Sequence, residues 1–341
     1  MSNDIKSLIL ELKKIQDEFS KKFGVKDIYS NSKVFEILIA NELEHTLIPG
    51  HSGSRDARDE EGEYEYKHFK ETSSNHSWTF NDYSNTVIKK LKNVKAVIFA
   101  HIDDTKGMPR FDWYYFVQGD VCSRYLKFRT LDLLKRMPKG IPNKRKMINF
   151  SPIQLERDLK VKKISVEKIN INGKYYPWLI RLNKISIKIE KITGISQILT
   201  SNKIWEFLVS LKLDGHNVLS EQVGHDAKDE EGNYYEYKVS KNFSWNFQDI
   251  SNEVLKKYEN DKSIILAIVD KENMKVIKIF EAEPKSVIRR LKEKLEEKHE
   301  RYKSKGGLRR LQVSLSKGDL DKIGARSIFP SRQKVLNRTA N

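Results

Sequence analysis

One long stretch of this sequence occurs twice, in the same order and about 170 residues apart. The clearest pair is DARDEEGEYEYK (56–67) and DAKDEEGNYYEYK (226–238), in which ten of the twelve residues of the first copy recur. The other pairs are 30–43 with 200–213, 78–90 with 245–257, 95–103 with 262–270 and, more weakly, 148–159 with 313–323. A period of this length indicates a duplicated domain rather than a solenoid unit. The chain is therefore expected to fold as two copies of one architecture.

The spacing of the repeats predicts the domain organisation, and 341 residues are enough for two domains. The expected parts are an N-terminal helix (1–27), repeat 1 (28–165), a connecting segment (166–197), repeat 2 (198–330) and a basic tail (331–341). The connecting segment is expected to contain a strand-like bridge within 166–190. The N-terminal helix would turn one apolar face inward, formed by Ile5, Leu8, Ile9, Leu12 and Ile15.

Hydrophobic periodicity gives each half the same order of elements. In the first half we expect a helix at 33–43, two short strands around a turn at 59–62, and a strand at 63–69. An amphipathic helix at 78–92, buried strands at 96–102 and 112–118, and a helix at 122–136 follow. The expected fold class is α/β, with a mixed sheet flanked by helices in each of two tandem domains.

The balance of charge narrows the partners. Lysine and arginine outnumber aspartate and glutamate by 64 to 47, giving a formal net charge of +17. Such an excess is typical of a polyanion binder, because neutralised phosphates release counterions; a lysine-rich genome is the alternative explanation. The single cysteine, Cys122, allows no intrachain disulfide, and no apolar run reaches the roughly 18 residues of a membrane helix. We expect a soluble protein of a reducing compartment.

The repeated window places acidic and basic side chains on one face of a hairpin. A four-residue turn at 59–62 would set Asp56 opposite Glu65, and cross-strand partners lie about 5 Å apart. Because side chains alternate along a strand, Lys67 shares the face of Glu65. Two carboxylates there would bind a hard cation such as Mg²⁺. The adjacent ammonium would hold a water or offset charge on a phosphate.

The second copy carries one extra residue. Asp226, Glu236 and Lys238 meet if its turn is five residues long, 229–233. The insertion would then change the turn and spare the face, as a constraint on the three residues would produce, although drift in a loop gives the same result. A surface hairpin with solvated charges is the alternative explanation of both windows. Asp59 and Asp229 are alternative first carboxylates, but the turn points them toward solvent.

An Asp followed by Glu-Tyr-Lys on the next strand resembles the motif of the PD-(D/E)xK nucleases, which include most type II restriction endonucleases. The resemblance covers roughly 33–103 and 203–270. The proline that precedes the first Asp in that family is replaced by Arg55 and His225. Its first helix often carries a further acidic residue near the metal, which implies that role for Glu36 and Glu206; an exposed face or a salt bridge would account for them equally well.

This resemblance implies a Mg²⁺-dependent endonuclease that hydrolyses double-stranded DNA and leaves 5′-phosphates. Asp56, Glu65, Asp226 and Glu236 would bind metal, and Lys67 and Lys238 would position water. The fused halves would act as a monomer in a prokaryotic cytoplasm, one half for each strand, as part of a restriction-modification system. Two rival functions remain open: a DNA-binding protein whose sites no longer cut, and a repair or junction nuclease.

Residues that would contact DNA lie in polar and basic loops. The clusters 135–146 and 303–310 suggest phosphate contacts, and the longer loops 50–55 and 71–77 of the first half suggest base readers. Trp78, Phe80 and their counterparts Trp245 and Phe247 could stack on bases, but their repetition favours core packing. The expected contacts are Arg55, Asn75, His76, Lys144, Arg145, Lys146, Lys305, Arg309 and Arg310.

Overall fold

The computed structural model describes residues 3–50, 55–81, 84–105, 107–136, 147–200, 202–219, 224–248, 250–303 and 312–330. Contacts divide the chain into two compact units, Met1–Asn202 and Lys203–Asn341.

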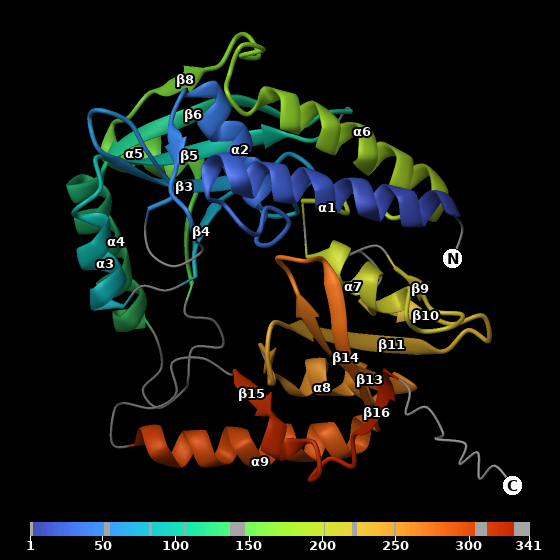
Figure 1. The fold of residues 1–341 in the computed structure, drawn as a ribbon. Coiled ribbons are helices and arrows are strands. Elements are labelled where there is room, and N and C mark those ends of the chain that lie inside the picture. Colours follow the sequence, from blue (N-terminus) through green and yellow to red (C-terminus); the bar gives the residue numbers. More distant parts are fainter. Residues whose placement is uncertain are drawn as a thin grey trace, which may run out of the picture. The chain divides into compact units, whose positions relative to one another are not determined.

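Unit 1 is built on a six-stranded mixed sheet with the order β1-β2-β3-β5-β6-β8 (Figure 1). β3 and β5 run parallel, and the other neighbours are antiparallel. β5 is buried along nearly its whole length, which explains its unbroken apolar run. The strands are β1 (Thr46–Leu47), β2 (Ala57–Arg58), β3 (Glu63–Lys70), β5 (Ala96–Asp103), β6 (Arg110–Gln118) and β8 (Lys163–Ser165).

Unit 2 contains a sheet of the same order, again with six strands and one parallel pair, β11 with β13. Its strands are β9 (Asn217–Val218), β10 (Ala227–Lys228), β11 (Tyr234–Ser240), β13 (Ser263–Asp270), β14 (Lys275–Ala282) and β16 (Arg326–Phe329). The chain is thus α/β, and two similar mixed sheets flanked by helices suggest two tandem domains, as the repeat predicts.

Helices and a two-stranded sheet cover each large sheet. In unit 1 these are α2 (Lys33–Glu42), α3 (Asn85–Leu91), α4 (Gly119–Arg136), α5 (Pro152–Leu159), β4 (Trp78–Phe80) and β7 (Ile148–Phe150). In unit 2 they are α7 (Lys203–Ser210), α8 (Asn252–Glu259), α9 (Pro284–Lys303), the 3₁₀ turn Lys317–Asp319, β12 (Ser244–Phe247) and β15 (Val313–Ser316).

The aromatic pairs belong to the core. Trp78 and Trp245 are buried, and their Nε1 groups donate to the carbonyls of Ala100 at 2.8 Å and Ala267 at 2.9 Å. The prediction of a continuous helix over 78–92 is wrong at its start, because Trp78 and Phe80 point inward with the period of a strand. The helix begins only after Ser84, whose hydroxyl accepts from the Val87 amide.

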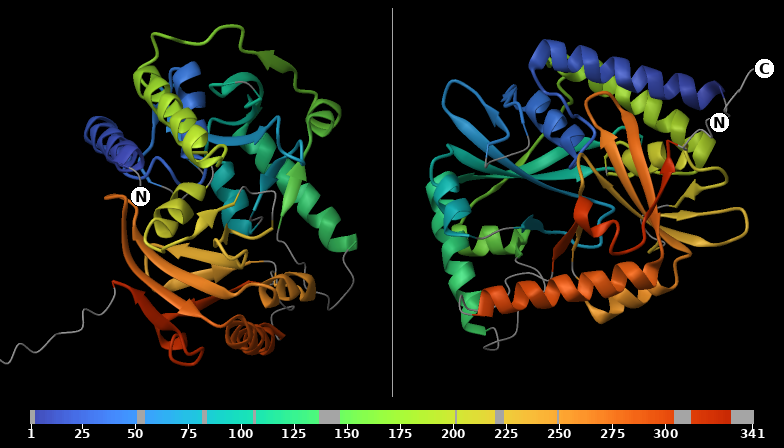
Figure 2. Two further views of the ribbon diagram at one scale, coloured as in Figure 1. Left: turned by 90° about the vertical axis from the view of Figure 1, so that its right-hand side faces the viewer. Right: turned by 60° about the horizontal axis from the view of Figure 1, so that its bottom comes forward.

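Unit 1 has two helices, α1 (Asn3–Phe23) and α6 (Tyr176–Thr193), that have no counterpart among the described residues of unit 2, and they lie side by side (Figures 1 and 2). The expected strand-like bridge within 166–190 is wrong, because α6 occupies most of it. The apolar residues Leu179, Leu182, Ile185 and Ile189 recur at helical spacing and are buried.

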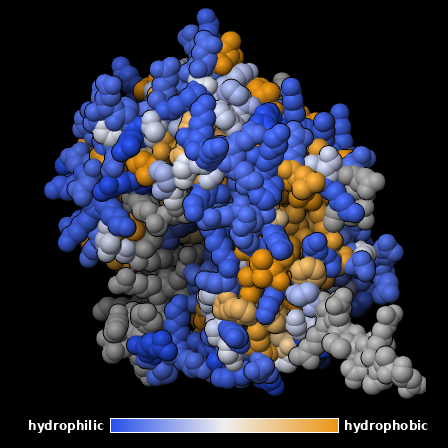
Figure 3. Space-filling model, in the orientation of Figure 1, coloured by the Kyte–Doolittle hydropathy of each residue, from blue (hydrophilic) through white to orange (hydrophobic). Residues whose placement is uncertain are grey.

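The visible face of the molecule is mostly hydrophilic, in keeping with a charged fraction of 33% (Figure 3). Among the described residues no helix is both long and apolar enough to cross a membrane.

Candidate active site

The two hairpins have the predicted registers. Ala57 lies opposite Tyr64 in unit 1, and Ala227 lies opposite Tyr235 in unit 2, so the turns are 59–62 and 229–233. The extra residue of the second copy is therefore absorbed in its turn. The Asp that precedes each pair is held by the facing strand: Asp56 Oδ2 accepts from the Tyr66 amide at 2.7 Å, and Asp226 Oδ2 accepts from the Tyr237 amide at 2.8 Å.

In unit 1 the structure brings together the carboxylates and lysines that we call site 1: Lys33, Glu36, Asp56, Glu65 and Lys67. The Lys67 ammonium forms an ion pair with Glu65, and the Lys33 ammonium forms one with Glu36. The charge of Asp56 acts on both glutamates. The Oε2 atom of Glu65 is buried without a hydrogen-bond partner. Site 1 is thus a largely buried, charged cluster at one face of the hairpin.

In unit 2 the equivalent cluster, site 2, consists of Lys203, Glu206, Asp226, Glu236 and Lys238. Lys238 pairs with Glu236, and Lys203 Nζ lies 2.6 Å from Glu206 Oε2 and 3.4 Å from Asp226 Oδ1. In both units the lysine of the second strand also lies over a core ring: Lys67 Nζ is 5.4 Å from the centre of Phe80, and Lys238 Nζ is 5.5 Å from that of Phe247. The two clusters therefore repeat in contacts as well as in sequence.

Burial makes the glutamates reluctant to ionise. Burial, and next the charge of Asp56, raise the pKa of Glu36 to about 8. Burial raises the pKa of Glu65 to about 7 although Lys67 opposes it. The same causes raise the pKa values of Glu206 and Glu236 to about 7. Each cluster therefore carries more carboxyl groups than it can ionise easily without further positive charge.

The lysines remain charged. Burial alone would lower the pKa of Lys67, but Glu65 and Asp56 raise it above its usual range. Glu236 has the same effect on Lys238. These groups can therefore donate hydrogen bonds and offset negative charge, but they cannot serve as bases near neutral pH.

Lys33 and Lys203 were missed by sequence reasoning. Both are buried and both contact the acidic residue three positions later on the same helix. The repeat contained a signal for them, because both lysines stand at the same place of the duplicated sequence, at the end of SNSK (30–33) and SNK (201–203). Glu36 and Glu206 are therefore in ion pairs, one of the two alternatives that the sequence left open, and they also lie at the predicted acidic cluster.

Asp59 and Asp229 have a structural place in the turns. Asp59 accepts from the Tyr64 hydroxyl at 2.9 Å, and Asp229 accepts from the Tyr235 hydroxyl at 2.8 Å. Two further residues missed from the sequence, His45 and His216, lie beside these tyrosines and bond to Tyr66 and Tyr237 at 2.8 and 2.6 Å. These contacts lock the sheet face opposite Glu65 and Glu236, because side chains alternate along a strand.

The donor atoms fit a hard divalent cation. Carboxylate oxygens are the ligands that such a cation prefers. The Oε2 atom of Glu65, which has no hydrogen-bond partner, could coordinate it. Yet no group of three or more His, Cys, Asp or Glu side chains is arranged as a metal site anywhere in the part of the chain that the structure describes. Lysines occupy the positions facing the glutamates instead. Metal binding would therefore require the lysine contacts of Glu36, Glu65, Glu206 and Glu236 to rearrange.

The surroundings of the two clusters differ. In unit 2 the His225 ring bonds to the buried Asp261 at 2.7 Å, and the second oxygen of Asp261 has no hydrogen-bond partner. Asp261 acts electrostatically on Glu236. In unit 1 the residue equivalent to His225 is Arg55, which pairs with Glu63 at 2.8 Å. Site 2 thus has one more carboxyl group nearby.

The predicted DNA contacts are only partly placed. Arg55 is exposed beside Asp56, and Asn75 and His76 lie in the 71–77 loop, where the His76 ring bonds to the Glu71 carbonyl at 3.0 Å. Lys144, Arg145, Lys146, Lys305, Arg309 and Arg310 lie outside the described residues, as do most of the loop 50–55 and the tail 331–341.

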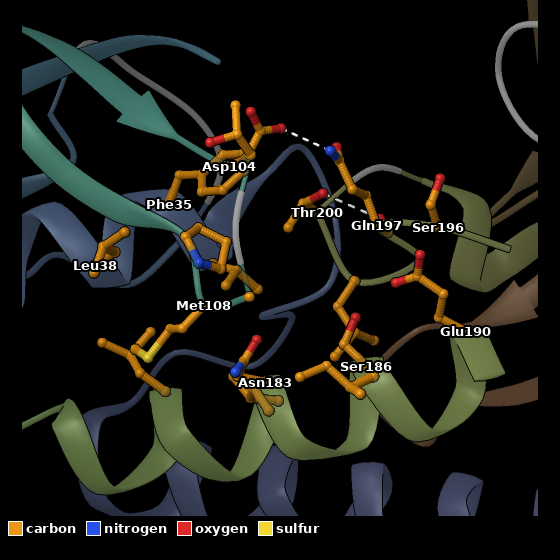
Figure 4. Close-up of a pocket in the computed structure, with 18 residues that line it drawn as sticks. Phe35, Leu38, Asp104, Met108, Asn183, Ser186, Glu190, Ser196, Gln197 and Thr200 are labelled. Atoms are coloured by element: carbon orange, nitrogen blue, oxygen red, sulfur yellow. Dashed lines mark hydrogen bonds between the residues drawn. The ribbon is translucent and has the colours of Figure 1, made fainter. Parts of the chain in front are cut away.

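A cavity of about 430 Å³ lies between α2 and α6 in unit 1 (Figure 4). Phe35 and Leu38 of α2 line it, and Asn183, Ser186 and Glu190 of α6 lie along another wall. The charged residues in its lining, Asp104 and Glu190, are both acidic. A phosphate would be repelled there, so this cavity is a poor substrate site for a nuclease.

No family model matches this chain, and no curated protein matches its sequence. The contacts within the two clusters are therefore what supports a function.

Proposed function

We propose that the chain is a Mg²⁺-dependent endonuclease with two sites of the PD-(D/E)xK type, which together make a double-strand break in DNA. The observation that carries the proposal is the repeated cluster: an Asp before the hairpin turn, a Glu and a Lys on the next strand, and a Glu on the preceding helix, at equivalent places in both units. A mixed sheet flanked by helices in each unit also suits that family.

Each residue has a chemical role in this proposal. Asp56 and Glu65, with Glu36 nearby, would hold the cation in unit 1; Asp226, Glu236 and Glu206 would do so in unit 2. The cation supplies positive charge that offsets the charge developing on the scissile phosphate. Lys67 and Lys238 donate to the attacking water and orient it, since their ammonium groups stay protonated. Attack forms a P–O bond to the water oxygen, whose proton passes to solvent, and breaks the P–O3′ bond; the 3′-oxygen takes up a proton from solvent, so the products are a 5′-phosphate and a 3′-hydroxyl.

Recognition of a specific sequence, as in a restriction enzyme, is part of the proposal. Its support is the difference between the units at the 71–77 loop, which is longer than its counterpart at 240–244. Unequal loops would allow two similar units to read unequal half-sites.

Digestion of a mixed-sequence plasmid tests the proposal. The wild-type chain with Mg²⁺ should give discrete fragments with 5′-phosphate ends, and EDTA or the double variant Lys67→Ala/Lys238→Ala should abolish them. Binding without any cleavage would favour a DNA-binding protein with inactive sites. Cutting only at branched substrates would favour a repair nuclease.

A further inference from the structure

Each unit has a polar cleft between a helix and the two-stranded sheet. The helix is α4 in unit 1 and α9 in unit 2. The cleft of unit 1 has a volume of about 400 Å³ and is lined by Arg129 and Arg136 of α4, Asn149 of β7, and Asn75 and His76. The cleft of unit 2 has a volume of about 340 Å³ and is lined by Lys294, Lys298 and Arg301 of α9 and Ser314 of β15. Glu297 of α9 also lines it, and its carboxylate pairs with Arg290 at 3.2 Å. Figure 1 shows β15 beside α9 in unit 2.

The two clefts are equivalent positions of the duplicated fold. Residues 129, 133 and 136 of α4 and residues 294, 298 and 301 of α9 correspond one to one, 165 residues apart. Spacings of four and three residues put each set on one face of its helix. Basic side chains occupy two of these positions in unit 1 and all three in unit 2. A basic cleft is thus a feature of the domain and not of one copy.

The floor of each cleft connects it to the adjacent catalytic cluster. In unit 1 Asn149 accepts from the Thr79 hydroxyl at 3.0 Å, and in unit 2 Gln312 donates to Asn246 at 2.7 Å. Thr79 and Asn246 each precede the phenylalanine that lies beside the lysine of the cluster. One short strand in each unit is therefore hydrogen-bonded to a residue that lines the cleft and places an aromatic ring beside the lysine of the cluster.

One arginine in each cleft, Arg129 in unit 1 and Arg301 in unit 2, is open to an anion, whereas Lys294 pairs with Asp319 and Lys298 donates to the Gln312 carbonyl. Arg129 is half-buried, and its guanidinium lies 5.8 and 6.0 Å from the rings of Tyr125 and Phe150, which hold it in place. Among the described residues no carboxylate is within salt-bridge distance of Arg129 or Arg301, whereas Arg136 pairs with Asp132 at 2.5 Å. Arg129 Nη1 donates to the Tyr125 hydroxyl at 3.1 Å, and the remaining N–H groups of the guanidinium suit a phosphate.

We propose that these two clefts are binding sites for phosphates of the DNA backbone, one in each unit. That the polyanion is DNA rests on the proposed function. The clefts and their charges are observed independently of that function. Such contacts hold and orient the duplex and carry no sequence information of their own. In unit 1 Asn75 and His76 join the same cleft, so the backbone contact and the proposed base readers are adjacent there.

Fluorescence anisotropy with a labelled mixed-sequence duplex, in EDTA and over a series of salt concentrations, tests this proposal on the full chain. Arg129→Gln/Arg136→Gln and Lys298→Gln/Arg301→Gln should each weaken binding roughly 10-fold or more and reduce the salt dependence of log Kd by about one per lost contact. Lys184→Gln/Lys188→Gln on α6, which removes two exposed charges elsewhere, is the matched control. Arg129→Lys/Arg136→Lys keeps the charge and should retain the salt dependence.

Wild-type affinity and salt dependence in both cleft variants, or an equal loss in the α6 control, would overturn the proposal. Circular dichroism verifies that the variants fold, and the lysine variant separates loss of charge from loss of packing. Plasmid digestion in parallel separates this proposal from the nuclease: DNA binding that depends on the clefts without any cleavage supports the clefts and defeats the nuclease. Cleavage with no dependence on the clefts does the reverse.

Discussion

The two units have the same sheet, the same hairpin and the same cluster of two lysines and three acids, yet the residues around the clusters differ. Tyr258 stands beside Lys238 where unit 1 has Leu91, and Asp261 stands where unit 1 has Val94. His225 replaces Arg55 next to the Asp of the hairpin. What both copies retain is thus the set of groups that converge, while the supporting layer has changed. A constraint on chemistry produces this pattern, whereas a constraint on surface charge alone would not.

The largest effect is expected from variants that inactivate one site at a time. In the proposed nuclease, Lys67→Ala should slow cleavage at site 1 at least about 100-fold, and Lys238→Ala should do the same at site 2, because each would lose the ammonium proposed to orient water and offset phosphate charge. Each single variant should then convert supercoiled plasmid to nicked circles, with the nicks on opposite strands.

The matched controls are Lys89→Ala and Lys256→Ala, which remove exposed lysines at equivalent positions of α3 and α8. Strand-specific sequencing of the nicks provides the measurement. If each single variant of Lys67 and Lys238 cut both strands at the full rate, one site per strand would be wrong.

The second comparison concerns the cap after the two-stranded sheet. In unit 2 the buried Asp319 accepts from Ser316 and pairs with Arg290 at 2.7 Å and Lys294 at 2.6 Å. In unit 1 the equivalent Gln154 only completes a neutral capping box with Ser151. Asp319→Ala should cost about 3 kcal/mol, because it removes a buried carboxylate that Arg290 and Lys294 share, although Arg290 keeps Glu293 and Glu297. Gln154→Ala should cost about 1 kcal/mol.

Hydrogen exchange of β15 and β7 in mild denaturant measures each loss in its own unit. Asp319→Asn keeps an acceptor for Ser316, so its loss of stability is expected to lie between those of Asp319→Ala and Gln154→Ala. Equal losses in both units would mean that the charged network adds nothing to the cap.

Much of the fold could be predicted from the repeat. The hairpin registers follow from alternation and turn length, and the buried strands β5 and β13 follow from their apolar runs. The strand at Trp78–Phe80 was missed because three residues give too short a period to be separated from the helix that follows. Helix α6 was missed because it has no copy in unit 2, so the repeat gave no second reading of it.

The candidate site was predictable where it lies on one hairpin and less so where it depends on packing. Asp56, Glu65 and Lys67 share a face by strand geometry alone. Lys33 comes from another element, and nothing local says that a lysine will be buried. The ion pairs of Glu36 and Glu206 likewise depend on how a helix lies against the sheet.

The third test uses His68, which unit 2 replaces with Val239. Burial, and then Lys67 and Lys70, lower the pKa of His68 to about 4. Between that value and the unfolded pKa of about 6.5, only the unfolded chain binds the proton, so unit 1 loses stability as the pH falls. Wild type should lose about 1–2 kcal/mol more than His68→Val between pH 7 and pH 5.

Chemical denaturation at several pH values measures this difference. Val239→His should introduce a similar dependence in unit 2. Parallel pH profiles for wild type and His68→Val would contradict the prediction.

The smallest effect concerns Tyr258. Its ring centre lies 5.6 Å from Lys238 Nζ, and burial raises the pKa of its hydroxyl to about 12, so the group stays neutral and can accept from the ammonium. Tyr258→Phe removes one hydrogen-bonding group, for which about 1 kcal/mol is typical, so cleavage at site 2 should slow by about 3- to 10-fold while site 1 is unaffected. Tyr258→Leu, which installs the residue of unit 1, should slow it at least as much. Rates of first- and second-strand nicking distinguish the sites. If Tyr258→Leu left the rates of first- and second-strand nicking as they are in the wild type, the residues around site 2 would be interchangeable with those around site 1. Only the cluster of lysines and acids would then set the rate.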